Sequence, residues 1–265
     1  MRALRASRVA ALLALIAYSR YVLFVGSPKV ESSSSMMLRR SLSDDDFKTL
    51  QSRINELRER PILPLLVIDS MLPGQRLTFQ SPAEELRDLA DEEVGVIGVV
   101  RSRSGSFRAR HGTSATLKAV SSNQWELKGL RHFKVLGPAE EEGGITRAKV
   151  EWVNDEASEE DIKLAETLVP LVDEWTATLV EMGKEKYDGQ LTEILEDIGN
   201  MPEPKEAGQL AIWVAALVNP LPALGVAYEI RPAVLAASTI RDRLEVAIEG
   251  IRGSIDHISG KKRLF

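Results

Sequence analysis

Three histidines are the only side chains of this sequence that normally titrate near neutral pH, and they are far apart. His111, His132 and His257 have no second histidine at the spacing of a metal site, and the sequence contains no cysteine. We therefore expect no metal centre, disulfide or cysteine nucleophile. The nucleotide-binding pattern G-x-x-x-x-G-K-[ST] is also missing from the sequence, and no cofactor is predicted.

Carboxylates are frequent, but their pattern is typical of solvated surfaces. Glu84-Glu85, Asp91-Glu92-Glu93 and Glu159-Glu160-Asp161 stand in consecutive runs. General acid–base catalysis needs two carboxylates that oppose each other in a cleft, and consecutive residues do not favour that arrangement. An unrecognised hydrolase is a remote alternative, and we predict no catalytic residue.

One short segment is basic. It holds four arginines within ten residues, together with serine, glycine and one aromatic side chain; the members are Arg101, Arg103, Phe107, Arg108 and Arg110. Arginine beside an aromatic ring is compatible with RNA binding. The simpler interpretation is a flexible, solvated hairpin loop, because the chain beyond its first 40 residues is acidic overall. These residues are weak candidates for a binding site.

The first 40 residues differ in composition from the rest. They carry six arginines and one lysine against a single acid, Glu31, and include an apolar run from Val9 to Tyr18 and a serine run. An arginine-rich, serine-rich, acid-poor leader is typical of organelle targeting. We expect a leader over residues 1–42 that directs the chain to a plastid, with a mitochondrion as the alternative. A membrane anchor is less favoured, because about 20 apolar residues are needed to span a bilayer.

Residues 43–60 predict a helix that Pro61 ends, and residues 61–155 predict strands. Two apolar runs separated by Pro73-Gly74 indicate strand, tight turn and strand. Further strands are expected at Val94–Val100, His111–Val120, Gln124–Leu136 with a bend at Gly129, and Arg147–Val153, with a helix at Pro82–Glu92 and a solvated loop at Glu140–Gly144. Several short strands of this kind predict a small antiparallel β-barrel.

From residue 156 onward the apolar period becomes helical. A long helix should begin at Ser158 and kink at Pro170, and a final long helix should begin at Ser238. Shorter helices are expected between them, at Leu191–Ile198, Glu206–Val218 and Glu229–Ala236. Residues 156–265 are thus predicted to form an α-helical bundle, and Trp125, Trp152, Trp175 and Trp213 are assigned to the core. The fold class is α+β.

Several of these segments, in order, resemble the N-terminal domain family of Lon-type proteases. The matching segments are the strand–Pro-Gly–strand opening, Val96–Val100, Gly112-Thr113, Gly129–Val135, Ala211–Ala215 and Arg243-Leu244-Glu245. In particular the chain looks like the stand-alone Lon-domain proteins of plastids and cyanobacteria. The family usually carries an aromatic-acid-Pro-Arg-Tyr-Arg segment after the second strand. Phe79–Glu85 stands in its place here, so binding should differ in detail.

The resemblance implies a PUA-like barrel followed by a helical bundle, and a role in recognising polypeptides. It implies polypeptide clients, or an organellar protease or chaperone, as partners. The ATPase and Ser-Lys protease segments of a Lon protease have no counterpart in this sequence. The expected function is therefore non-catalytic, with the groove between barrel and bundle as the expected site, and an RNA-binding module that uses residues 101–110 as the alternative.

Overall fold

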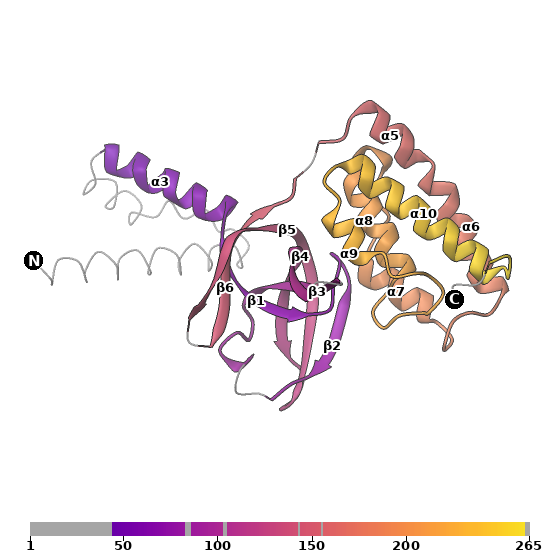
Figure 1. The fold of residues 1–265 in the computed structure, drawn as a ribbon, viewed down its shortest axis with the longest axis horizontal. Helices are drawn as coiled ribbons and strands as arrows, with labels where there is room; N and C mark the ends of the chain where they lie inside the picture. Colours follow the sequence, from indigo (N-terminus) through magenta and orange to yellow (C-terminus); the bar gives the residue numbers. More distant parts are fainter. Residues whose placement is uncertain (1–43, 83–85, 103–104, 143, 155, 263–265) are drawn as a thin grey trace, which may run out of the picture. The chain divides into compact units, whose positions relative to one another are not determined.

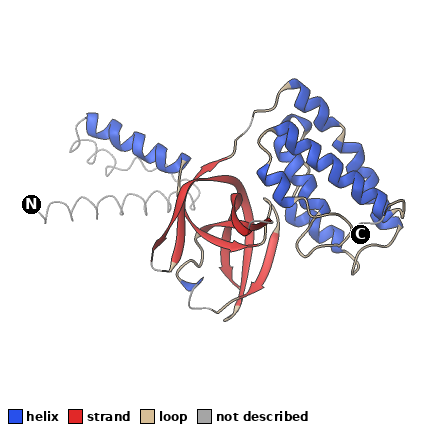
Figure 2. Ribbon diagram, viewed as in Figure 1, coloured by secondary structure: helices blue, strands red, loops and turns tan. Residues whose placement is uncertain are grey.

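The computed structural model describes residues 44–82, 86–102, 105–142, 144–154 and 156–262. The predicted leader, 1–42, lies outside the described residues. Helix α3 (Asp44–Glu59) comes first and ends just before Pro61, as predicted. Residues 55–265 form one compact unit. Within it the strands come first and the helices follow (Figures 1 and 2).

Six strands of the described residues make up the sheet. They are β1 (Ile62–Ile68), β2 (Arg76–Gln80), β3 (Glu93–Ser102), β4 (Gly105–Ala119), β5 (Gln124–Glu142) and β6 (Ile145–Trp152). Their order is β2-β5-β4-β3-β1-β6, and β5 also pairs with β6. The pairings therefore run in a ring from β1 through β3, β4, β5 and β6 back to β1. We call this ring the closed sheet; β2 is not part of the ring and pairs with residues 124–128 of β5.

Most strand pairs are antiparallel, as predicted, but β1 and β3 pair in parallel. A parallel pair needs a crossover of a dozen or more residues, and residues 69–92 supply it. The bend expected at Gly129 is confirmed, because the β4–β5 register shifts between Ser114 and Ala115, which face Arg131 and Gly129. Such a bulge turns a strand and increases its twist.

Two predicted elements of the sheet region are wrong in part. Among the described residues of Pro82–Glu92, only Leu86 and Arg87 are helical, because Asp91 and Glu92 instead exchange backbone hydrogen bonds with Leu117 of β4. The loop expected at Glu140–Gly144 is mostly strand. Glu140, Glu141 and Glu142 pair with β6, although the first two are exposed as expected.

Helices follow from residue 159. They are α5 (Glu159–Glu166), α6 (Leu168–Glu181), α7 (Gln190–Ile198), the 3-10 turn η1 (Pro204–Glu206), α8 (Ala207–Val218), α9 (Arg231–Ala236) and α10 (Ile240–Ile258). Helix α8 is buried at every residue from Leu210 to Val218, and α10 and α6 pack around this interior. In the part of the chain that the structure describes, no helix has the length and apolarity needed to cross a membrane.

The long helix predicted from Ser158 is broken rather than merely kinked at Pro170. Helix α5 ends at Glu166 and α6 begins at Leu168. A proline has no N–H and its ring clashes with the carbonyl four residues earlier, which here is that of Glu166. The final helix begins one residue later than predicted, because Thr239 rather than Ser238 caps it.

Glycines in the closed sheet allow strands to come close together. A Cβ added to Gly112 would lie 2.3 Å from the Val96 carbonyl oxygen and 2.9 Å from the Phe133 ring. Phe133 is fully buried, and so is Val96. The interior at this point has no room for a methyl group.

Replacing Gly112 should therefore destabilise the protein. We expect Gly112→Ala to lower the free energy of unfolding by about 1–3 kcal/mol, the usual effect of overpacking. The matched control is Gly253→Ala in α10, where an added Cβ meets nothing. Alanine favours helix over glycine by about 1 kcal/mol, so this variant should be as stable as wild type or more so. Urea denaturation of both variants measures the difference, and equal effects would contradict the prediction.

Candidate functional site

The loop between β1 and β2 joins the closed sheet to the helices. We call residues 69–75 the junction loop. Met71 and Leu72 are both fully buried, but Met71 packs in the cluster within the sheet and Leu72 packs in the helical cluster. Two neighbouring side chains thus enter two different cores. The Pro73-Gly74 turn that the sequence predicts is one of the points where the two parts of residues 55–265 meet.

Gly74 is required at this turn for two reasons. Its φ of +82° lies in the left-handed region, which residues with a Cβ rarely adopt. An added Cβ would also lie 2.9 Å from Cα of Ile198, the last residue of α7. The loop backbone therefore packs directly against the end of a helix.

Gln75 is buried and its amide supplies hydrogen bonds to both parts of the molecule. Its Oε1 accepts from Leu72 N–H at 2.8 Å, while Nε2 donates to the carbonyls of Asn219 at 2.7 Å and Ala216 at 3.4 Å. Ala216 lies in the last turn of α8, where carbonyls have no partner within the helix. A side chain next to the sheet therefore caps a helix of the bundle.

A lysine of β5 does the same for α7. Lys128 Nζ donates to the Asp197 carbonyl at 2.6 Å and to the Gly74 carbonyl at 2.7 Å. A cation at a helix C-terminus is favourable, because the helix dipole is negative there. The Asp197 carboxylate also binds Arg76 Nε at 3.0 Å, and Arg76 reaches Glu126 at 3.0 Å as well. The side-chain hydrogen bonds with Glu126 and Asp197 raise the pKa of Arg76.

A buried arginine adds an ion pair across the same junction. Arg231 at the start of α9 binds Glu229 and, at 3.1 Å, Asp69 of the junction loop. Burial by itself would lower the pKa of Arg231, but the two carboxylates outweigh it and raise the pKa. Removal of either acid would leave a buried cation with one partner fewer, which is costly.

Two histidines lie where β4 and β5 approach the helices. His132 of β5 is buried, and its ring makes an edge contact with His111 of β4, with 5.7 Å between ring centroids. Burial, Arg243 of α10 and His111 lower the pKa of His132 to about 3. The pKa of His111 is lowered by burial and by Lys134 and Arg243. His132 was predicted as a strand residue without a ligand role. No group of three or more metal-ligating side chains is present among the described residues.

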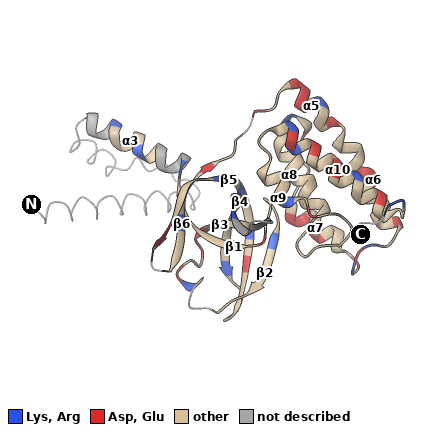
Figure 3. Ribbon diagram, viewed as in Figure 1, with Lys and Arg blue, Asp and Glu red and all other residues tan. Residues whose placement is uncertain are grey.

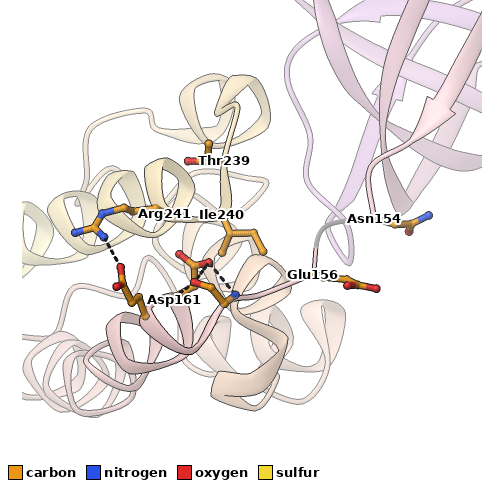
Figure 4. Close-up of a pocket in the computed structure, with 8 residues that line it drawn as sticks. Asn154, Glu156, Asp161, Thr239, Ile240 and Arg241 are labelled. Atoms are coloured by element: carbon orange, nitrogen blue, oxygen red, sulfur yellow. Dashed lines mark hydrogen bonds and ion pairs between the residues drawn. The ribbon is translucent and has the colours of Figure 1, made fainter.

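An open pocket lies beside the linker between β6 and α5. It has a volume of about 540 Å³ and is lined by Asn154, Glu156, Ser158, Glu160, Asp161, Thr239, Ile240 and Arg241. Figure 4 shows the linker residues Asn154 and Glu156 on one side and Asp161, Ile240 and Arg241, from α5 and α10, on the other. The site is polar and is built around the N-termini of two helices.

Most polar groups of this pocket are already engaged. The Ser158 hydroxyl and backbone N–H donate to the Asp161 carboxylate at 2.7 and 3.0 Å, which lowers the pKa of Asp161. Thr239 caps α10, and Arg241 pairs with Glu160 at 3.5 Å. Asp161 is therefore ionised at neutral pH and accepts hydrogen bonds. This chemistry suits the binding of polar groups and cations.

The arginine-rich candidates do not lie at this pocket. Arg101 belongs to β3, and Phe107, Arg108 and Arg110 belong to β4, so the predicted loop is largely the two arms of a β-hairpin. Arg108 and Arg110 are exposed. Arg103 lies outside the described residues.

The helices carry acidic residues. Figure 3 shows them on α5, α6, α7 and α10.

Three of the four tryptophans are core residues, as predicted. Trp125, Trp175 and Trp213 are buried, and Trp175 donates to Ser254 Oγ at 2.8 Å. Trp152 is only half-buried and packs against the edge of a core cluster, so its assignment to the core is confirmed only in part. The Arg131 guanidinium lies over its ring, 4.1 Å from the ring centroid, in a cation–π contact.

The sequence matches no known protein-family model and no curated protein. The structure, however, is similar to the N-terminal domain of the Lon protease of the Mycobacterium avium complex, with 17% identity and a TM-score of 0.50. The match covers 74% of this chain and 99% of that domain. A Lon N-terminal domain protein from Xanthomonas campestris is 18% identical over 71% of this chain and 96% of that one, with a TM-score of 0.41. The chain has the α+β fold of a Lon N-terminal domain, which confirms the resemblance.

Sequence reasoning found the junction loop but not its partners, and it missed the pocket. The Pro-Gly turn is visible in the sequence, whereas Gln75 and Lys128 give no local signal because their acceptors lie 54 to 144 residues away. The pocket joins residues near 156 to residues near 240. A capping residue at each helix start, Ser158 and Thr239, is the one signal that marks its two sides.

Gln75 should contribute measurably to stability. We expect Gln75→Ala to lower the free energy of unfolding by about 2–3 kcal/mol, because it leaves buried hydrogen-bonding groups of Leu72 and α8 without partners. Gln51→Ala on an exposed position of α3 is the control and should change it by less than about 0.5 kcal/mol. Guanidinium denaturation followed by tryptophan fluorescence measures both. Equal stability of the two variants would show that the Gln75 hydrogen bonds do not contribute to the free energy of unfolding.

Burial of His132 should make stability fall in acid. Below pH 6.5 the unfolded chain protonates this histidine, while the folded chain excludes the proton until about pH 3. The free energy of unfolding is therefore highest above pH 6.5 and falls as the pH falls toward 3. The loss by pH 4 is about 3 kcal/mol. Denaturation of wild type and His132→Gln between pH 8 and pH 4 tests this. The free energy of unfolding of the variant should fall less steeply with pH than that of wild type. Parallel curves would contradict the lowered pKa of His132.

Proposed function

We propose that this chain is a non-catalytic protein that binds extended or unfolded polypeptide segments. The fold carries the proposal, because the chain reproduces the two-part fold of a Lon N-terminal domain over nearly the whole length of that domain. The resemblance to the N-terminal domain family of Lon-type proteases implies recognition of polypeptide substrates, and we extend that role to this chain. It serves in substrate recognition, as a protease adaptor or in a chaperone-like role.

The site geometry supports binding rather than bond cleavage. Three carboxylates line the pocket beside α5 and α10, and hydrogen bonds from Ser158 lower the pKa of one of them, Asp161. A general acid would need a raised pKa at neutral pH. Polar groups in an open pocket of about 540 Å³ suit contact with side chains of a bound polypeptide.

The leader composition supports an organellar location. We propose a plastid, with a mitochondrion as the alternative, on the excess of arginine and serine and the shortage of acids before residue 42. Polypeptide clients or an organellar protease or chaperone would be the partners there. A fluorescent fusion to residues 1–42 expressed in plant cells tests the location.

RNA binding is the second candidate, because Arg108 and Arg110 are exposed on one strand of a hairpin. Phosphate contacts release counterions, so RNA binding through these residues would weaken steeply with salt. The acidic residues of the helices would repel RNA elsewhere on the molecule.

The two functions predict different ligands. The full-length chain should bind fluorescein-labelled β-casein, an unfolded polypeptide, in an anisotropy titration, and Arg108→Ala with Arg110→Ala should change its Kd by less than about two-fold. A labelled single-stranded 20-nucleotide RNA should bind weakly under the same conditions. Tight RNA binding that the double variant abolishes, with no β-casein binding, would reverse the proposal.

A further inference from the structure

Strand β2 leaves one side of the sheet open. The closed sheet is complete without it, and β2 pairs with β5 alone among the described strands. It lies at the end of the strand order and follows the junction loop directly. An unpaired strand edge is a template on which another extended chain can form a strand.

The register shows which main-chain groups face this edge. Ser81 N–H donates to the Asn123 carbonyl at 3.1 Å, and Gly129 N–H donates to the Gln75 carbonyl at 2.9 Å. Residues of an antiparallel pair alternate between facing the partner and facing away from it. Leu77 and Phe79 therefore bond to β5, and the N–H and C=O groups of Arg76, Thr78 and Gln80 point away from it.

The side chains agree with an accessible edge on a firmly held strand. Arg76, Thr78 and Gln80 are exposed, whereas Leu77 and Phe79 are partly buried against the sheet cluster that contains Trp125. Arg76 is held by Glu126 and by Asp197 of α7, at the junction with the helices. The edge is therefore held in an extended conformation before any ligand arrives, which reduces the entropic cost of binding.

We propose that an extended segment of an unfolded polypeptide binds as an added strand along β2. Three outward residues offer one donor and one acceptor each, at intervals of about 6.8 Å, which is two residues of an antiparallel strand. Another polypeptide backbone carries donors and acceptors at that same repeat. Recognition through the main chain gives affinity for many sequences, and it is an established mode of peptide binding. This inference rests on the proposed function and names its contact surface.

A proline at Thr78 tests the edge without disturbing the inner pairing. Proline removes an N–H that points outward and is tolerated on an edge strand. In an anisotropy titration of the full-length chain with fluorescein-labelled β-casein, we expect Thr78→Pro to raise Kd by about ten-fold or more, which corresponds to about 1.4 kcal/mol. Thr78→Val keeps the N–H and the β-branched shape, and it should stay within about two-fold of wild type.

Amide hydrogen exchange of the wild-type chain gives a second, independent measurement. On saturation with unlabelled β-casein, the amides of Arg76, Thr78 and Gln80 should slow, while those of Leu77 and Phe79, already bonded to β5, should change little. This alternation is specific to an added strand. It decides the proposal even if Thr78→Pro fails to fold.

The other results would each overturn strand addition in a recognisable way. Equal β-casein binding by wild type and Thr78→Pro, without the alternating protection, would leave the proposed function standing and remove this surface from it. No β-casein binding by wild type would end the proposed function itself. A wild-type dimer that Thr78→Pro converts to a monomer in light scattering would assign the edge to a second copy. Slow exchange at all three amides before β-casein is added would show that the chain itself covers the edge.

Discussion

The C-termini of α7 and α8 receive hydrogen bonds from β5 and from the junction loop. Gln75 donates to carbonyls at the end of α8, and Lys128 donates to a carbonyl at the end of α7. Such carbonyls have no partner within their own helix, and burying them unpaired would be costly. The sheet and the helices therefore stabilise each other through polar contacts as well as through Met71 and Leu72, which occupy separate cores.

This arrangement positions the surfaces available for binding. The junction loop leads directly into β2, so the contact that fixes the helices also fixes the start of an open strand edge. The linker after β6 leads into α5, whose N-terminus meets that of α10 at the polar pocket. In the function that we propose, the unpaired edge and the open pocket are the surfaces available to another chain, and strand β2 is already extended before that chain binds, which lowers the entropic cost.

Charge around the junction is balanced by close partners. Arg231 is buried and binds two carboxylates, and Asp197 receives both Arg76 and Lys128. His132 is different, because it is buried near Arg243 and its lowered pKa keeps it neutral. At neutral pH the junction therefore holds no unpaired charge at His132. In acid, protonation of His132 would place a second positive charge beside the buried Arg243.

The sequence by itself determined the elements and their class. Proline and glycine positions and apolar periods predicted the strands, the shorter helices and the change from sheet to bundle, because these signals act over a few residues. The tertiary structure decided strand direction, burial and long-range contacts, which such local signals do not specify. It made β1 and β3 parallel, ended the helix before Glu92 by bonding it to β4, and left Trp152 half-buried. It also assigned the partners of Gln75 and Lys128 and the open edge of β2, because each depends on groups distant in sequence that meet only when the sheet closes and the helices pack against it.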